Sequence, residues 1–458
     1  MKIYLLLLLG SCCTLSWCKP ASTQPLEIIT EQIKPQVAQL RELPFSQEIE
    51  IVFQSPEDLQ RVLQREIERT YPGETLRILE TRLLKFGFIV SPIHLDMLLT
   101  RLFSQQIAGY YDPIEKKMAL IQGNASGPHT SLFPLEMMSQ LFVQSMGLSL
   151  NNILLVHELT HVLQDQHFDL MSLLFEDLQQ EDMASAVRAL VEGDATLVMI
   201  DYILDQQQAG LDATQVPDIA ASMQRWANSP LVQGLGLFQT VPRYIMDNLL
   251  FSYLQGFEFV LRLKQQGHWK VINQAYADLP VSTEQILHPE KYYEARDWPS
   301  VIGLPDFAEK YSDWRLLEQN TLGEFNIHLL LDGFLPEEQA RLASAGWDGD
   351  RFGLYEHTMN GKLFLAWYTI WDTPRDAREF FEIYAAMLAK RHVGHSENQV
   401  LGDRITAVTW TTETGTILLE LRGSDVLLLD GFPEQFQEDI MTTFWQSVKA
   451  DFQKDIVY

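Results

Sequence analysis

The chain has 458 residues, 46% of them hydrophobic, which is enough for two or three domains with sizeable cores. Its 61 acidic residues outnumber 34 Lys and Arg, giving a formal net charge of −27. Such a surface repels nucleic acid and anionic lipid headgroups, so we expect neither as a partner.

Residues 1–18 have the composition of a bacterial secretory leader, with one Lys before an apolar run too short to span a bilayer. Leu9-Gly-Ser-Cys12 resembles a lipobox, so we expect a lipid anchor at Cys12, with simple cleavage as the alternative. All three cysteines lie here, which excludes disulfides and cysteine-based zinc sites elsewhere. We therefore expect secretion across the bacterial inner membrane to a periplasmic or envelope-anchored location.

The rest of the chain changes character twice. A polar, proline-containing stretch at 19–45 is expected to be a tether with a first helix, and residues 46–297 then carry mostly helical periodicity. Within them, 48–53 alternates like a strand, and Ser55-Pro-Glu-Asp58 has the caps that begin a helix. Two short strands are predicted around an Asp-Pro turn at 107–122.

The most informative motif is His157-Glu-Leu-Thr-His161, inside an apolar segment with a candidate Asn N-cap at 151 and no Gly or Pro up to 167. Imidazoles four positions apart project from one face of a helix, so both can bind one metal ion. Glu158 lies one step around the helix, where it can act on water held by that ion. This is the arrangement of a zinc peptidase.

Two residues compete as the third ligand. His167 has the spacing that metzincin peptidases use, but Gln164 stands where those enzymes need a helix-breaking Gly. On a continuous helix His167 therefore points away from the metal face. Glu192 lies among apolar residues on a second predicted helix, beside Gly193, which allows close approach of another segment. We prefer Glu192, because two His, one Glu and an open position form a catalytic zinc site; a solvated Glu192 paired with Arg188 is the alternative.

These residues resemble the gluzincins, the thermolysin-like zinc metallopeptidases. The match comprises His157 to His161, Asp165 and a glutamate on a following helix, although Glu192 follows at a greater distance than in thermolysin. The longer stretch from His157 to Leu170, with Val191-Glu-Gly-Asp-Ala195, resembles a little-characterised group of bacterial secreted metallopeptidase-like proteins. The resemblance covers about 50 residues.

The resemblance implies a single Zn²⁺ that activates a water, with Glu158 accepting its proton, and a peptide or protein substrate. It also implies an oxyanion donor, for which His288 is the first candidate and Tyr110, Tyr111 and Tyr293 are others. An ordinary loop histidine is the alternative for His288.

Two further roles complete the predicted site. Asp165, Asp194 or Asp169 is expected to orient a ligand imidazole, with Asp165 preferred. A strand over the site helix is expected to pair with extended substrate, and Met118 to Gln122, with Met118 and Leu120, is the best segment for it. A plain structural hairpin is the alternative.

Residues 298–458 are predicted to form a smaller α+β domain of unknown role. Strands are expected at 363–371, 405–410, 417–421 and 425–429, with helices at 373–390 and after Pro433. Between Trp347 and Arg351 an Asp-Gly turn is expected, with an ion-binding cluster as the alternative. Pro280 to Asp297 is expected to form an irregular loop. The predicted fold class is thus α+β, a mostly helical zincin-like domain with a small edge sheet followed by this domain.

Two other functions are compatible with parts of the sequence. A di-iron carboxylate protein also uses a Glu-x-x-His unit, but it needs a second one, which this chain lacks. A non-catalytic cell-envelope binding protein could keep the metal helix as a scaffold, although it would not require Glu158.

Overall fold

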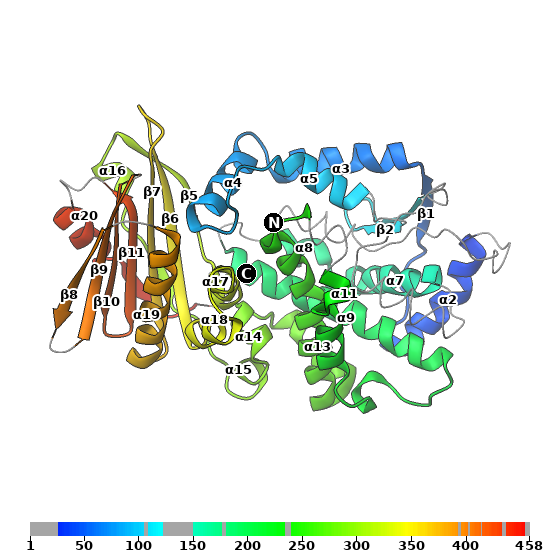
Figure 1. Ribbon diagram of the computed structural model, residues 1–458. Coiled ribbons are helices and arrows are strands. Elements are labelled where there is room, and N and C mark those ends of the chain that lie inside the picture. Colours follow the sequence, from blue (N-terminus) through cyan, green and yellow to red (C-terminus); the bar gives the residue numbers. More distant parts are fainter. Residues whose placement is uncertain are drawn as a thin grey trace. The chain divides into compact units, whose positions relative to one another are not determined.

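The structure is a computed structural model that describes residues 26–104, 109–121, 150–175, 180–233, 240–392, 395–401, 404–413, 415–432 and 437–453. It has the mixed α+β fold that the sequence predicts, with a helical N-terminal region and a sheet-rich C-terminal region (Figure 1). The chain divides into two compact units. The first comprises Met1–Leu76, Pro92–Glu176 and Ser185–Pro280, and the second comprises Arg77–Ser91, Asp177–Ala184 and Val281–Tyr458.

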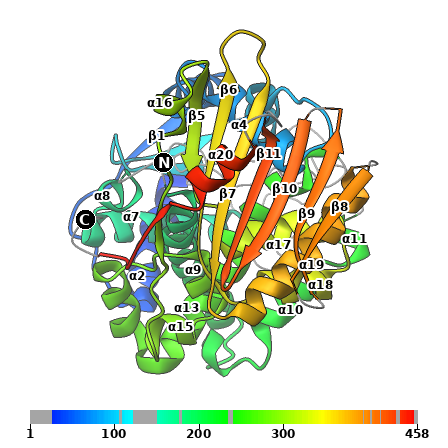
Figure 2. The same cartoon turned by 90° about the vertical axis from the view of Figure 1, so that its left-hand side faces the viewer.

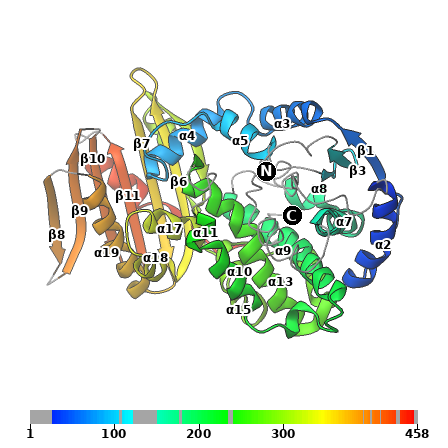
Figure 3. The ribbon, with the colours of Figure 1, turned by 45° about the vertical axis from the view of Figure 1, so that its right-hand side comes forward.

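The first unit is mainly helical (Figure 3). Its helices are α2 (Leu26–Arg41), α3 (Pro56–Thr70), α5 (Leu95–Ser104), α7 (Leu150–Phe168), α8 (Leu170–Phe175), most of α9 (Glu181–Gln206), η2 (Ala213–Gln215), α10 (Ile219–Ala227), α11 (Pro230–Gln233) and α13 (Arg243–Ala277). The predicted helix after Ser55 is α3, and Ser55 caps it by accepting from the Asp58 N–H while Asp58 accepts from the Ser55 N–H. Helix α13 has non-helical backbone at Gly267 and His268.

A three-stranded sheet accompanies these helices. It contains β1 (Glu50–Gln54), β2 (Gly109–Asp112) and β3 (Lys117–Ile121) in the order β1-β3-β2. Strand β1 pairs with β3 in parallel, and β2 pairs with β3 antiparallel through the predicted turn. The sheet therefore has β3 at its centre and β2 at one edge.

Helices α9 and α13 cross where each carries a glycine. A Cβ on Gly193 would lie 2.1 Å from the Gly256 carbonyl oxygen, and a Cβ on Gly256 would lie 2.2 Å from the Ala189 carbonyl oxygen. The two backbones are therefore in direct contact, which is the close approach that the sequence predicts at Gly193. This crossing fixes the turn of α9 that carries Glu192.

Replacing Gly193 by Ala should destabilise the protein. Gly to Ala within a helix normally stabilises it, but here the new methyl group collides with backbone that cannot rotate away. We expect a loss of about 3 kcal/mol in the free energy of unfolding, measured by chemical denaturation. Gly333→Ala is the control, because a Cβ there meets nothing closer than 3.5 Å. Equal stability of the two variants would contradict this account of the crossing.

The second unit is built on a seven-stranded antiparallel sheet in the order β5-β6-β7-β11-β10-β9-β8 (Figure 2). The strands are β5 (Trp314–Asn320), β6 (Trp347–His357), β7 (Leu363–Trp371), β8 (His395–Leu401), β9 (Arg404–Thr412), β10 (Gly415–Arg422) and β11 (Asp425–Phe432), and β4 (Val301–Gly303) pairs separately with β12 (Val448–Ala450). The helices are α4 (Thr75–Phe86), α14 (Thr283–Leu287), α15 (Glu290–Tyr293), α16 (Phe307–Lys310), α17 (Gly323–Asp332), α18 (Glu337–Ser344), α19 (Pro374–Arg391) and α20 (Gln437–Phe444).

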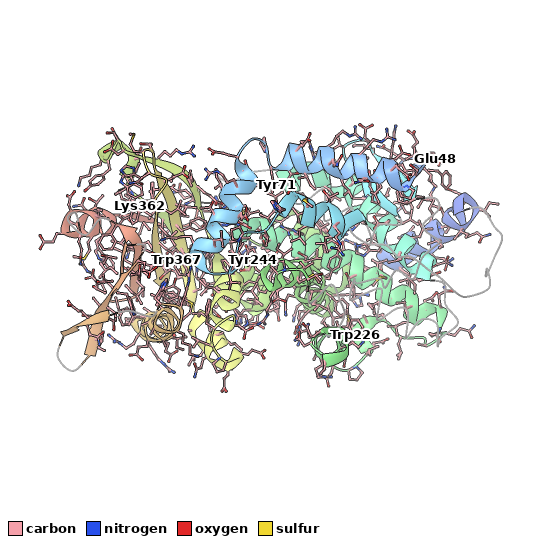
Figure 4. The ribbon with its side chains drawn as sticks, turned by 45° about the horizontal axis from the view of Figure 1, so that its top comes forward. Glu48, Tyr71, Trp226, Tyr244, Lys362 and Trp367 are labelled. Atoms are coloured by element: carbon pink, nitrogen blue, oxygen red, sulfur yellow. The ribbon has the colours of Figure 1, made fainter. Side chains whose placement is uncertain are left out.

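Apolar side chains cover both faces of this sheet. On one face Trp367 of β7, labelled in Figure 4, packs edge-on against Phe380 and Tyr384 of α19. On the other face Phe364 packs against Phe307 of α16 and Phe444 of α20. The helices bury a sheet that is apolar on both sides, which explains the nearly continuous apolar runs in β7 and β11.

Two predictions for this unit are wrong. The Asp-Gly turn at 348–349 lies inside β6, where Asp350 is buried and accepts from two backbone N–H groups and from the indoles of Trp347 and Trp367. Gly349 instead allows close approach, since a Cβ would lie 2.3 Å from the Ser300 carbonyl oxygen. The predicted loop at 280–297 contains α14 and α15, and Ser282 caps α14.

The unit boundary also differs from the predicted division at 297. The first unit ends at Pro280, and segments 77–91 and 177–184 belong to the second. Buried Arg82 ties these segments to the sheet, because it pairs with Glu181 and, at 2.9 Å, with Glu318 of β5. Ion pairs between residues so far apart in sequence leave no local pattern to predict.

Candidate metal centre

The motif helix α7 is buried over most of its circumference. Two apolar residues before the motif, Ile153 and Val156, are at most 1% exposed. His157, Glu158 and His161 are equally inaccessible, at 1%, 2% and 1%. Burying three such polar groups is costly unless they are paired or bind an ion, so their partners decide what the site is.

The structure brings His157, His161 and Glu192 together. The two Nε2 atoms lie 3.0 Å apart, and Glu192 Oε2 lies 3.2 Å from His157 Nε2 and 3.6 Å from His161 Nε2. Glu192 comes from α9 and is 1% exposed. Ligands of a tetrahedral zinc ion, at bonds near 2.0–2.1 Å, are separated by about 3.3 Å. The three donor atoms therefore have the spacing of one face of a zinc tetrahedron.

His167, the competing third ligand, lies away from this cluster. Helix α7 continues to Phe168, so residue 167 is carried around to another face. Its Nε2 lies 2.8 Å from the Pro44 carbonyl oxygen at an exposed position. The geometry thus favours Glu192 as the third donor.

The protonation of the cluster also fits a bound cation. Burial opposes charge on Glu192, but the two imidazoles outweigh it and lower the pKa of Glu192 to about 2. Burial likewise opposes charge on His161, but Glu192 and Glu158 outweigh it and raise the pKa of His161 to about 9. Burial lowers the pKa of His157. Glu192 Oε1 accepts no hydrogen bond within the described residues. The cluster thus stabilises one positive charge and retains an unused carboxylate oxygen.

A metal ion at this cluster would compete with a proton for His161. Because the pKa of His161 is raised from 6.5 to about 9, a zinc ion would have to displace a proton at neutral pH. We expect zinc affinity to rise about tenfold per pH unit between pH 6.5 and 9, measured by chelator competition corrected for the chelator's own protonation. In metal-free protein a rise in pH has the opposite effect, because it weakens the fold. The His161–Glu192 pair stabilises the fold below pH 6.5, and that stabilisation is lost as the pH rises through 9. A pH-independent affinity would contradict this protonation state.

The group that orients an imidazole is Gln164, which the sequence did not indicate. Its Oε1 lies 2.7 Å from His161 Nδ1, which leaves Nε2 directed towards Glu192. The prediction that Asp165 contacts an imidazole is wrong, because Asp165 accepts from the Tyr111 hydroxyl and the Leu170 N–H. Asp194 lies beyond Gln164 as seen from His161, and it accepts a hydrogen bond from Gln164 Nε2 at 3.1 Å.

Glu158, the predicted base, is held by the edge strand β2. Its Oε2 accepts from the Tyr111 N–H at 3.0 Å, and the Tyr111 hydroxyl donates to Asp165 one helix turn beyond His161 at 2.8 Å. Since this N–H points to α7, it lies on the side of β2 that does not pair with β3. The carboxylate of Glu158 therefore sits at the outer edge of β2.

The predicted substrate strand is wrong for the same reason. Met118 and Leu120 lie on β3, which pairs with β1 on one side and β2 on the other. Their side chains are also buried. Sequence periodicity located both strands of the hairpin, but it could not show which one lies at the edge, because β1 pairs with β3 from a segment far earlier in the chain, with Glu50 opposite Lys117.

His288, the first candidate for the oxyanion donor, belongs to the second unit. There it ends α14, and its Nε2 lies 3.1 Å from Glu324 Oε1. Tyr293 is in that unit too, and Tyr110 donates to Gln54. In the first unit Tyr253 of α13 lies beside the cluster, with its ring 6.0 Å from that of His157.

Tyr253 is fully buried, and it was not identified from the sequence. Burial, then the carboxylates of Glu192 and Glu158, raise its pKa well above the ordinary value, so it stays a neutral phenol. It lies in an apolar helical run whose spacing is that of core residues, so no motif singles it out. Within the first unit, Tyr253 is therefore a further candidate for the oxyanion donor.

A second group of acidic residues, in the second unit, already surrounds a cationic side chain. The carboxylates of Glu284, Asp297 and Asp372 lie close enough to hold a cation. Lys291 Nζ, however, lies 2.7, 2.9 and 3.0 Å from them. The lysine ammonium group serves as their cation.

Several expectations lie outside the described residues. They include the leader at 1–18, the lipid-anchor residue Cys12 and the first part of the tether. Residues 26–41 of the predicted tether form α2, the first helix expected there, and its Ile33, Val37 and Arg41 are buried rather than lying in a tether. In the described part of the chain, no helix combines the length and the apolar composition that crossing a membrane requires.

Comparison with known proteins gives one match. A family described as a domain of unknown function, DUF8575, matches residues 314–441. The match begins at the first residue of β5 and ends within α20, so it spans the seven-stranded sheet. No curated protein and no solved structure matches the chain. The candidate metal centre lies outside the matched segment.

Proposed function

We propose that this protein is a zinc-dependent peptidase in which His157, His161 and Glu192 hold one Zn²⁺ and Glu158 is the general base. The observation that carries the proposal is the buried set of two imidazoles and one carboxylate, with donor separations of 3.0, 3.2 and 3.6 Å. Three protein ligands with nitrogen and oxygen donors are the set of a catalytic rather than a structural zinc site.

A zinc ion bound there would act as a Lewis acid and lower the pKa of water. Glu158, beside His157 on the same helix, would accept the proton and deliver it to the leaving amine. To do so it must exchange its hydrogen bond from the Tyr111 N–H for one from the reacting groups. The neutral phenol of Tyr253 would donate to the oxygen of the substrate carbonyl as negative charge develops.

The position of Glu158 suggests how a peptide is held. The outer edge of β2 supplies the Tyr111 N–H next to the proposed base. An extended peptide added at this edge would pair through its main chain, which would make recognition tolerant of sequence. Because the sequence of residues 1–18 predicts a secretory leader, we propose that this activity belongs to the periplasm or to a lipid-anchored protein of the cell envelope.

One observation favours a second candidate, a non-catalytic envelope protein that uses the metal as a structural element. All four residues of the centre are at most 2% exposed, and Glu158 is already hydrogen-bonded to backbone. A peptidase must open this region for every substrate, whereas a structural site does not. Both candidate functions require the bound metal, but only the peptidase hydrolyses peptides.

The test is metal analysis and peptide turnover on the same purified full-length protein. The peptidase proposal requires one zinc per chain, casein or peptide hydrolysis that stops when a chelator removes the zinc, and recovery on adding zinc back. One zinc per chain without hydrolysis would support the structural candidate. Hydrolysis that persists without metal would overturn both.

A further inference from the structure

We propose that Arg41, Asp194 and Gln164 form a buried relay that positions His161 for metal binding, and that this relay makes the metal centre dependent on the N-terminal helix α2. The inference rests on the metal site of the proposed function but not on peptide hydrolysis. It assigns a role to three residues outside the predicted ligand set.

The first link is the orientation of the Gln164 amide. An amide can present either its oxygen or its nitrogen to a neighbour, and only the oxygen can accept from His161 Nδ1–H. Gln164 Nε2 donates to the Val191 carbonyl oxygen at 2.9 Å and to Asp194 Oδ2 at 3.1 Å, and both of these atoms only accept. The amide is thereby locked with Oε1 towards His161, which keeps the imidazole Nε2 free to bind metal.

The second link is the charge on Asp194. Its side chain is 0% exposed, and such a carboxylate is costly without a cation. Arg41 Nε lies 2.8 Å from Oδ1, and the Tyr276 hydroxyl donates to Oδ2 at 2.8 Å. Asp194 therefore remains an acceptor for Gln164 because Arg41 balances its charge.

The third link anchors Arg41. It is the last residue of α2, and its Nη2 donates to Asn273 Oδ1 at 2.7 Å. Its guanidinium group also lies over the Trp269 ring, 4.5 Å from the centroid. A planar guanidinium group held on several sides fixes the carboxylate beyond it more closely than a flexible ammonium group would.

A purely structural ion pair is the competing explanation, and the same unit offers its control. Lys264 and Asp201 are also buried, at 4% and 3% side-chain exposure, and Lys264 Nζ lies 4.5 Å from the same Trp269 ring. This pair supports the backbone of Ala213 rather than Gln164. Replacing Lys264 should therefore destabilise the unit without changing the metal site.

The experiment measures zinc affinity and the Co²⁺ absorption spectrum of the full chain in four variants. We expect Gln164→Leu to weaken zinc binding by about 10–100-fold and Arg41→Gln by about tenfold, both with altered cobalt bands. Arg41→Lys should recover part of the loss, and Lys264→Gln should match wild type in both readouts. Equal effects of Arg41→Gln and Lys264→Gln, or no effect of Gln164→Leu, would overturn the relay.

A second pair of variants, each of which removes only one hydroxyl group, tests the relay if the Arg41 variants do not fold. Tyr276→Phe removes only the hydroxyl that donates to Asp194, and we expect zinc binding about threefold weaker. Tyr202→Phe removes a buried hydroxyl bonded to Asn152 and should leave zinc affinity unchanged. Equal zinc affinity of these two variants would also overturn the relay.

The outcomes separate this inference from the proposed function. Zinc binding that responds to the relay variants without any peptide hydrolysis would overturn the peptidase and keep the relay. Zinc-dependent hydrolysis with relay variants that bind zinc like wild type would overturn the relay and keep the peptidase. A wild-type protein that binds no zinc would overturn both.

Discussion

Glu158→Gln is expected to lower peptide hydrolysis by about 10²–10⁴-fold while leaving zinc bound, because general base catalysis contributes on that order. The amide has the shape of the carboxylate and can still accept from the Tyr111 N–H, so the fold should be kept. It cannot take up a proton. The measurement is the initial rate of peptide cleavage, with zinc content determined on the same samples.

The control for Glu158→Gln is Glu258→Gln, which changes a partly buried carboxylate that accepts from Gln224 in the same unit. We expect this control to keep wild-type activity and metal. If both variants cleave peptide at the wild-type rate, Glu158 is not the base. If Glu158→Gln also loses zinc, the carboxylate of Glu158 contributes to metal binding rather than to proton transfer.

Glu192→Gln is expected to weaken zinc binding by about 100-fold or more. Apparent binding free energies of about 10–16 kcal/mol for four-ligand zinc sites correspond to roughly 3 kcal/mol per ligand, or about two orders of magnitude. A neutral amide also loses the charge that the two imidazoles favour at this position. The measurement is zinc affinity by chelator competition, with circular dichroism as a check on folding.

His167→Ala is the matched control for Glu192→Gln, because His167 is the other candidate third ligand. Its Nε2 lies beside the Pro44 carbonyl oxygen, so zinc affinity should not change. The opposite pattern, with zinc lost in His167→Ala and kept in Glu192→Gln, would restore the metzincin-like spacing and reject the present site.

The fold was predictable where the pattern is local. Ser55 and Pro56 marked the start of α3, and apolar runs located β7 and β11. The Asp-Gly pair at 348–349 misled because a buried hydrogen-bond network around Asp350 keeps β6 extended. Partners of that network come from β7 and the start of α17, which no local window contains.

The same holds for the candidate site, where local patterns were predictable and contacts between distant segments were not. His157, Glu158 and His161 follow from helical spacing, and Glu192 was proposed from its apolar surroundings and the glycine beside it. Gln164 and Tyr253 were missed, because their roles depend on α9 and α13 packing against α7. His288 was chosen from its sequence context alone. It pairs with Glu324, and both residues belong to the second unit.

Anomalous X-ray scattering at the zinc edge, on crystals of the full chain grown with zinc, tests the central claim most directly. We expect a single peak within about 2.0–2.2 Å of His157 Nε2, His161 Nε2 and a carboxylate oxygen of Glu192. A zinc ion bound by other residues, or no peak between these three side chains, would contradict the account.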